Sequence, residues 1–105
     1  MRFLTLEKLM NLEDGYRKQV VVANKELLLL QEQGRVHLIQ ASCPHMHWPL
    51  SAAIVDDGTI LCRKHHMAFR LDNGKAANEQ ARGCKALAIY QLSYEGSDIG
   101  IWINE

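Results

Sequence analysis

Two short segments, each with one thiol and one imidazole, constrain this chain more than any other feature. They are Cys43-Pro44-His45 and Cys62-Arg63-Lys64-His65, and sixteen residues separate His45 from Cys62. Two thiolates and two imidazoles are ligands for a transition metal, and two interpretations compete. One is a structural zinc ion bound by all four side chains. The other is a two-iron cluster, with both cysteines on one iron and both histidines on the other.

The distribution of the ligands favours the cluster. A common zinc module places Cys-x-x-Cys in one segment and a pair of histidines or of further cysteines in the other. Here each segment provides one thiolate and one imidazole, so two matching loops would clamp a flat Fe2S2 unit from both sides. Because imidazole is neutral, the iron bound by two histidines accepts the electron more readily, and the reduction potential rises above that of an all-cysteine cluster.

The two segments resemble the cluster loops of the Rieske-type iron–sulfur proteins. The first loop is similar to the run from Cys43 to Leu50, and the second to Cys62–His65 followed by Phe69. The resemblance implies a Rieske-type [2Fe-2S] cluster, one per chain, and no catalytic residue. It assigns the cofactor and metal ligands to Cys43, His45, Cys62 and His65.

The loops depart from the family pattern at several positions. Arg63 stands where the family usually has Pro, and His66 stands where it usually has Gly, although the family spacing selects His65 as the ligand. High-potential members have a serine and a tyrosine hydroxyl where this chain has Met67 and Phe69. Neither side chain offers a hydroxyl to a cluster sulfur. The resemblance therefore implies a potential in the lower part of the family range of about −150 to +300 mV.

The rest of the sequence predicts an all-β fold, because short apolar stretches alternate with turn residues. We expect a Rieske-like antiparallel β-sandwich or barrel with a small cluster-binding subdomain. Asp56-Asp57-Gly58 predicts a hairpin that brings the two loops together. The run at 25–31 also suits a helix by propensity, but the valines before it and Gly34 after it favour a strand. Residues 87–92 and 99–103 predict a last hairpin, and Trp102 is expected in the core.

Length and composition restrict the class of protein. A chain of 105 residues, 48% of them hydrophobic, predicts one domain over 1–105, with the cluster-binding subdomain at roughly 41–72. Zero net charge gives no support to nucleic-acid binding. No apolar run approaches the ~20 residues that span a membrane, and charges near the start argue against a signal peptide. We therefore expect a cytoplasmic protein. An odd third cysteine, Cys84, argues against a disulfide framework and is expected to pack in the core.

The resemblance also implies a function. The chain is similar to the ferredoxin components of bacterial ring-hydroxylating dioxygenase systems, which carry single electrons from a flavin-dependent reductase to a terminal oxygenase. It is too short to include an oxygenase domain, so we expect a monomeric electron carrier rather than an enzyme. Two alternatives remain open. One is the small subunit of a nitrite-reductase-like enzyme, although many such subunits lack the cluster ligands. The other is a zinc-stabilised binding module.

Overall fold

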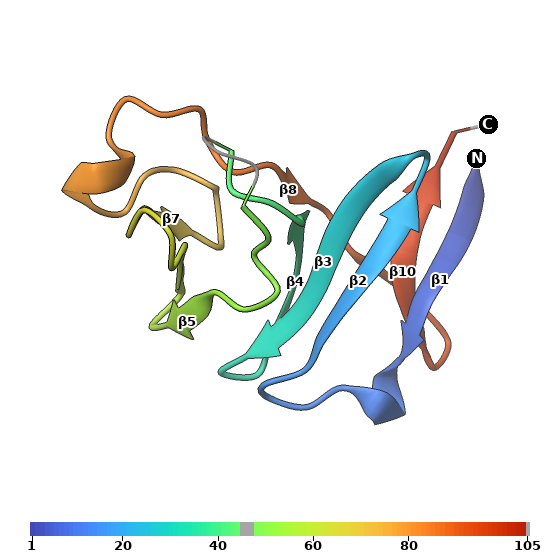
Figure 1. Ribbon diagram of the computed structural model, residues 1–105. Helices are drawn as coiled ribbons and strands as arrows, with labels where there is room; N and C mark the ends of the chain where they lie inside the picture. The colour runs from blue at the N-terminus through green and yellow to red at the C-terminus, as the bar shows by residue number, and fades with distance from the viewer. Residues whose placement is uncertain (45–47, 105) are drawn as a thin grey trace.

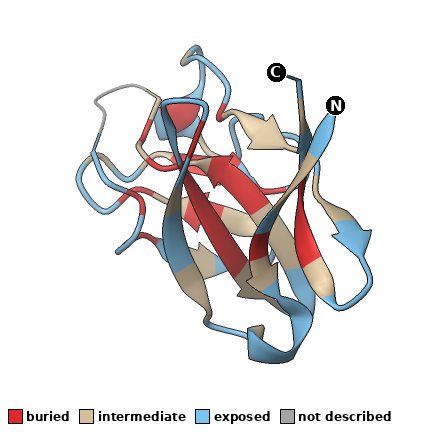
Figure 2. Cartoon of the chain, turned by 90° about the vertical axis from the view of Figure 1, so that its right-hand side faces the viewer, coloured by how far each residue is buried: buried red, intermediate tan, exposed pale blue. Residues whose placement is uncertain are grey.

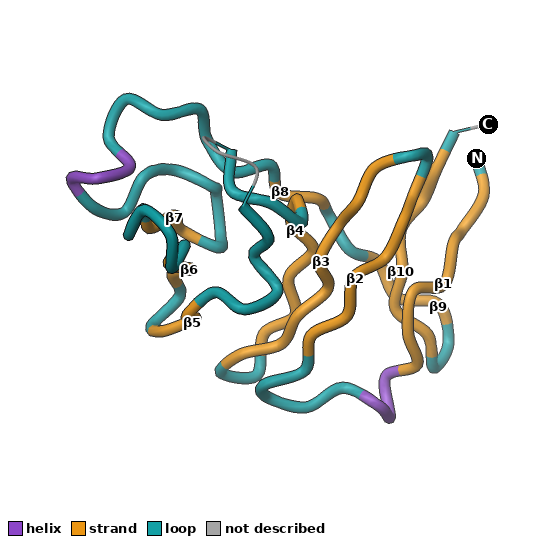
Figure 3. The backbone as a smooth tube through the Cα atoms, viewed as in Figure 1, coloured by secondary structure: helices purple, strands orange, loops and turns teal. Residues whose placement is uncertain are grey.

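The computed structural model describes residues 1–44 and 48–104, and these form an almost entirely β structure (Figures 1 and 3). Two short 3-10 helices, η1 (Leu9–Asn11) and η2 (Glu79–Ala81), interrupt the strands. The strands are β1 (Arg2–Lys8), β2 (Arg17–Val22), β3 (Lys25–Glu32), β4 (Arg35–Gln40), β5 (Ile54–Asp56), β6 (Thr59–Leu61), β7 (Ala68–Arg70), β8 (Ile89–Tyr90), β9 (Ser93–Glu95) and β10 (Asp98–Ile103). The predicted all-β antiparallel fold is confirmed.

Three antiparallel sheets contain these strands. Their orders are β1-β10-β9, β2-β3-β4-β8 and β5-β6-β7. The third sheet belongs to a small lobe, which we define as residues 41–87; the remaining described residues form the base. In Figure 1 the small lobe lies at the opposite end of the molecule from the two chain termini. The described residues contain no helix with the length and apolar character needed to cross a membrane.

Strand β3 explains how the molecule is layered, because all four of its consecutive leucines are buried. Leu28 and Leu30 belong to a core shared with the small lobe, whereas Leu27 and Leu29 belong to a core shared with β1 and β10. Alternate side chains of a strand point to opposite faces of its sheet. The four-stranded sheet is therefore the middle layer, covered on both faces, and its buried strand runs through the interior in Figure 2. The predicted strand is confirmed.

The hairpin turns follow from residues that tolerate left-handed backbone angles. Asp57 and Gly58 have φ of 48° and 76° and join β5 to β6, with Ile54 opposite Leu61. Positive φ at both central residues is the geometry of a two-residue turn that suits the right-handed twist of strands. The predicted hairpin at Asp56-Asp57-Gly58 is confirmed, and it places the start of the second loop beside the start of β5.

The predicted last hairpin is wrong in its first strand. Tyr90 and Ile89 of β8 pair with β4 in the middle sheet, whereas β10 pairs with β9 at Ser93–Glu95. The apolar run at 87–92 does not serve one strand, because Leu87 packs in the small-lobe core and Leu92 packs against the base core. The chain passes from one core to the other within this run.

Trp102 is not in the core, contrary to the prediction; its exposed fraction is 47%. Ile99 and Ile101 of β10 are buried, and the alternation of the strand turns Trp102 to the outer face. There its ring packs edge-on against Phe3 of β1, with 5.3 Å between the ring centroids. The aromatic residue thus stabilises the outside of the β1–β10 pair.

The small lobe leaves and rejoins the base at adjacent points. The Gln40 N–H donates to the carbonyl of Ala88 (3.0 Å), and the Ala88 N–H donates to the Gln40 side-chain oxygen (2.7 Å). The Gln40 amide nitrogen also donates to the carbonyl of Ser42 (2.7 Å). One side chain therefore joins both ends of the lobe to the last residue of β4.

Candidate metal centre

Cys43 and Cys62 begin two loops of the small lobe with the same closing hydrogen bond. Cys43 lies three residues after β4, and its N–H donates to the carbonyl of Trp48 (2.7 Å); Cys62 directly follows β6, and its N–H donates to the carbonyl of Met67 (2.9 Å). In each loop the bond spans five residues. Both cysteines are fully buried and belong to the same core. The structure therefore places both predicted thiol ligands in one buried core.

The histidines of the second loop differ in their environments. His65 is half-buried, and its Nε2 atom is shielded from solvent. His66 is exposed. His45, the remaining predicted ligand, and His47 lie outside the described residues. Within 1–44 and 48–104, no three His, Cys, Asp or Glu side chains converge on a single-ion site.

The second loop adopts the backbone turn that a glycine would favour, even though the residue is His66. The φ angle of His66 is 58°, and its N–H donates to the carbonyl of Cys62 (2.9 Å). A left-handed conformation costs a residue with a Cβ roughly 1–2 kcal/mol. His66 therefore adopts a backbone conformation that a glycine would take without this cost. Other contacts must hold it.

One such contact comes from Asn78, a residue that no sequence pattern singled out. Its side-chain nitrogen donates to the His66 carbonyl (2.8 Å), and its side-chain oxygen accepts from the N–H groups of Ala68 (3.1 Å) and Ala81 (3.1 Å). Asn78 lies in a polar segment with no apolar periodicity. A side chain that bonds to backbone across twelve residues leaves no pattern in a single sequence.

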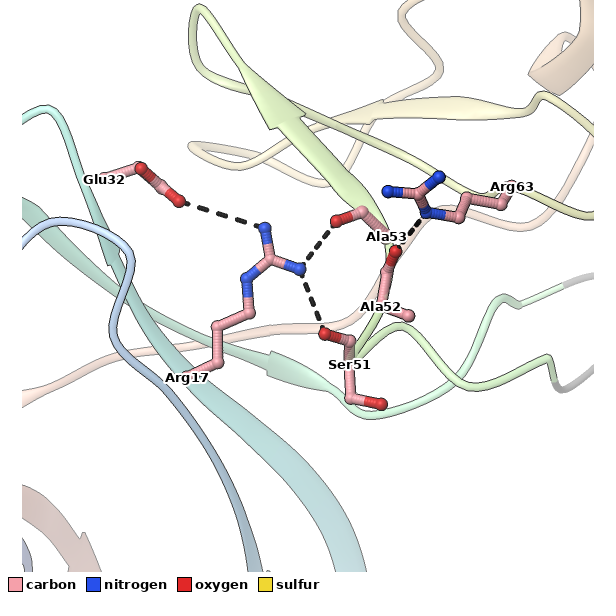
Figure 4. Close-up of polar contacts among 6 residues, drawn as sticks. All are labelled: Arg17, Glu32, Ser51, Ala52, Ala53 and Arg63. Carbon is pink, nitrogen blue, oxygen red and sulfur yellow. Dashed lines mark hydrogen bonds and ion pairs between the residues drawn. The ribbon is translucent and has the colours of Figure 1, made fainter.

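Arg63, another departure from the family pattern, connects the two halves of the site. Its Nε donates to the carbonyl of Ala52, just after the first loop (2.5 Å; Figure 4). From the base, Arg17 of β2 donates to the carbonyls of Ser51 (3.0 Å) and Ala53 (2.6 Å). Three successive carbonyls are therefore held by two guanidinium groups, which approach from different sides in Figure 4.

Trp48 and Lys64 form a second bridge between the loops. The Lys64 ammonium lies 5.2 Å from the centroid of the Trp48 ring, a cation–π geometry. Trp48 is 44% exposed, and both Lys64 and Arg63 are also exposed. The described parts of the two loops thus present an indole and two cations to solvent.

Cys84 is half-buried rather than fully within the core, and it is separate from the predicted ligands. Its Sγ lies 3.9 Å from the Met67 sulfur, and Met67 packs against the small-lobe core. The buried neighbour Phe69 belongs to the same core. Cys84 therefore contacts the second loop through the side chain of Met67.

The described donor groups fit an iron–sulfur cofactor. The thiols of Cys43 and Cys62 are buried, and the Nε2 atom of His65 is shielded from solvent. Thiolate and imidazole groups are suitable ligands for iron or zinc. They come from two loops that close with the same backbone hydrogen bond. Fold and site together define the class: a small all-β protein with two cysteine-containing loops that close with the same hydrogen bond.

The comparisons with known proteins identify the family. A model of the Rieske [2Fe-2S] domain matches residues 3–91. The chain therefore belongs to the Rieske [2Fe-2S] domain family, its cofactor is a [2Fe-2S] cluster, and it carries electrons rather than catalysing a reaction.

Two relatives with similar sequences differ greatly in length. The chain is 30% identical over 90 residues to the ferredoxin component of the alkene monooxygenase system of Xanthobacter autotrophicus, covering 85% of this chain and 71% of that protein. It is 26% identical over 91 residues to mouse apoptosis-inducing factor 3, covering 87% of this chain but only 15% of that longer protein.

The structural neighbours share the fold at lower identity. The ferredoxin of carbazole 1,9a-dioxygenase from Nocardioides aromaticivorans superposes with a TM-score of 0.81 at 18% identity, covering 95% of this chain and 96% of that one. A chain in a complex of reduced oxygenase and oxidised ferredoxin of carbazole 1,9a-dioxygenase matches with a TM-score of 0.78 at 18% identity, covering 91% and 97%.

Proposed function

We propose that the cluster is bound by Cys43, His45, Cys62 and His65, with the thiolates on one iron and the imidazoles on the other. The burial of both thiols in one core, at the start of two loops with the same closure, carries this assignment. The exposure of His66 beside half-buried His65 supports the choice between these neighbours. When bound, the cluster accepts and releases one electron.

Substitution of the ligands tests the assignment. We expect Cys43→Ala, Cys62→Ala, His45→Ala and His65→Ala to lose the visible colour, together with iron and acid-labile sulfide, which should otherwise be near two each per chain. His66→Ala and the matched cysteine control Cys84→Ala should retain all three. A coloured His65→Ala variant with a colourless His66→Ala variant would reverse the choice of histidine. Colourless wild-type protein that contains one zinc ion per chain would contradict the cluster and support the zinc-module alternative.

We also propose that the whole chain acts as one domain, a monomeric and cytoplasmic ferredoxin that passes electrons from a flavin-dependent reductase to a terminal oxygenase. The alkene monooxygenase ferredoxin supports this, because that relative is named as the ferredoxin component of an oxygenase system. A structure with the same fold is a chain from a complex of oxygenase and ferredoxin, which supports an oxygenase as a partner. The cluster-binding part is proposed to be 41–72, completed by the segment that ends at Leu87.

The test is reconstitution with candidate partners. The purified protein should be reduced by a flavoprotein reductase and should in turn support turnover of an oxygenase that has no activity without it. Reduction without any oxygenase turnover, together with stable co-purification with a large reductase subunit, would favour the nitrite-reductase-like alternative.

Electron transfer is proposed to occur at the loop surface formed by Trp48, Arg63 and Lys64. Residues 41–55 and 62–71 include no Asp or Glu, although the whole chain has zero net charge. A partner with an acidic face would be attracted to this end. We expect the transfer rate to fall as salt rises, and Lys64→Ala or Trp48→Ala to slow transfer. Trp102→Ala, which removes an equally exposed indole from the base, is the control and should leave the rate unchanged.

The reduction potential is proposed to be low for the family. Phe69 is fully buried in the core and Met67 packs against it, so the two positions that carry hydroxyls in high-potential members carry apolar groups here. Without those donors the added negative charge of the reduced state is less stabilised. A redox titration should give a midpoint in the lower part of the range of about −150 to +300 mV. A midpoint well above ~+150 mV would contradict the proposal.

A further inference from the structure

Asn78 occupies a position between the second loop and the segment that follows β7. The backbone pairs β7 with residues 75–77: the Arg70 N–H donates to Lys75 (2.8 Å), and the Ala77 N–H donates to Ala68 (2.8 Å). Beyond Ala77 the backbone ladder stops. The half-buried side chain of Asn78 then takes over both roles, accepting from Ala68 and donating to His66. One amide therefore continues a strand pairing into the loop.

The two bonds of this amide enclose the part of the loop that requires support. His66 has the left-handed φ of 58°, and its carbonyl is the acceptor of the Asn78 N–H. Ala68, which donates to the Asn78 oxygen, lies two residues further on. Between them lies Met67, whose carbonyl accepts the N–H of Cys62. The amide thus fixes the backbone on both sides of the bond that closes the loop.

We propose that Asn78 is a positioning residue for the cluster. Its amide holds His66 in a left-handed conformation that only glycine adopts without steric cost, and so sets the direction from which His65 meets the iron. The inference rests on the proposed ligand role of His65. Groups behind a metal ligand that fix its orientation commonly change metal affinity by 10–100-fold when removed.

A simpler role for Asn78 is to cap η2, because its oxygen also accepts from Ala81. The cap uses the Asn78 oxygen, which also accepts from Ala68, whereas only the nitrogen reaches the His66 carbonyl. Aspartate is as good an N-cap as asparagine and retains oxygens for Ala68 and Ala81, but it lacks the N–H that reaches the His66 carbonyl. Asn78→Asp therefore keeps the cap and the bond from Ala68 and removes the bond to the His66 carbonyl.

The experiment measures how fast the purified holo-protein loses visible absorbance to an iron chelator, together with the EPR g-values of the reduced cluster. We expect bleaching about 10- to 100-fold faster in Asn78→Ala, a smaller acceleration in Asn78→Asp, and shifted g-values in both. Asn73→Asp is the matched control: it introduces the same charge into the same lobe at an exposed residue whose side-chain oxygen accepts from the Lys75 N–H. It should behave as wild type.

A second background tests the role of His66 directly. In His66→Gly the backbone needs no support to remain left-handed, so Asn78→Asp should accelerate bleaching by a smaller factor than in the wild-type background. An equal factor in both backgrounds, or wild-type bleaching and g-values in Asn78→Asp, would overturn the inference while leaving the coloured cluster and its proposed ligands intact. A colourless wild-type protein would instead overturn the proposed function and this inference with it. Far-UV circular dichroism of each variant identifies any that has failed to fold.

Discussion

The two faces of the middle sheet support two different kinds of structure. On the base side, long strands pair directly, and β1 aligns with β10 from Arg2–Ile103 to Lys8–Asp98. On the other side, β5, β6 and β7 have three residues each, and side chains such as Arg17 and Asn78 bind to the backbone of the connecting segments. The base is held by repeated strand pairing and apolar burial. The small lobe depends more on individual side-chain contacts.

Neighbouring leucines of β3 give the largest test of this difference. Leu28 and Leu29 are both buried, one on the small-lobe side and one on the base side. Replacing either with Ala should cost about 2–5 kcal/mol of unfolding free energy. In Leu28→Ala the visible absorbance should be lost at a lower temperature than the far-UV signal of the base. In Leu29→Ala both transitions should fall together, and identical behaviour of the two variants would contradict the separation of the faces.

Two glycines provide a second pair. In the small lobe, a Cβ at Gly74 would collide with the carbonyl of Leu87, and the φ angle of Gly74 is positive, at 76°. In the base, a Cβ at Gly100 would collide with the carbonyl of Leu4. Either substitution by Ala should cost about 1–3 kcal/mol. Gly74→Ala should accelerate cleavage of residues 75–87 by a protease with little change in the base. Gly100→Ala should lower the urea midpoint of the whole molecule. Gly34→Ala is the control, because Gly34 has open space for a Cβ but a φ of 75°. Its effect measures the cost of backbone strain without a steric collision.

Arg17 tests the connection between the two regions. Its guanidinium binds two carbonyls of the small lobe and also lies 3.8 Å from Glu32. Arg17→Ala should destabilise the lobe by about 1 kcal/mol, seen as faster hydrogen exchange in residues 51–53. Arg17→Lys keeps the charge but lacks the forked donors, so it should recover little of the loss. Full recovery of stability in Arg17→Lys would mean that the charge alone stabilises the lobe. Arg82→Ala, which removes an exposed arginine, is the control and should have little effect.

The smallest expected effect concerns the base alone and depends on pH. Hydrogen bonds from the Asn11 side chain, the Tyr16 hydroxyl and the Lys8 N–H lower the pKa of Glu7 to about 2, from 4.5. A depressed pKa contributes stability above the unfolded value, and this stability is lost as pH falls from 4.5 toward 2. Tyr16→Phe should therefore lower the melting temperature by a few degrees at pH 7, and the difference should shrink at pH 3. The same melting-temperature difference at both pH values would mean that Tyr16 stabilises the base by packing and not through Glu7.

The sequence predicted the parts of the fold that local patterns determine. Asp57-Gly58 marked a hairpin because few residues adopt those angles, and the leucine run bracketed by turns marked a strand. The run at 87–92 misled because apolar residues alone do not reveal which core each one enters. The ligand pattern was visible in the spacing, whereas the support from Asn78 was not, because a single side chain binding distant backbone has no periodicity.

The junction at Gln40 and Ala88 gives the small lobe the geometry of a transplantable insert. Its two ends meet at one hydrogen-bonded pair of residues, so a host hairpin would have to accept the insertion at its exposed connection, where insertions are tolerated. The host sheet would also have to offer an apolar footprint equivalent to Leu28, Leu30 and Ile39, the residues through which β3 and β4 enter the small-lobe core. Those three positions, with the junction, specify the minimal acceptor for grafting this redox module onto another β-sheet.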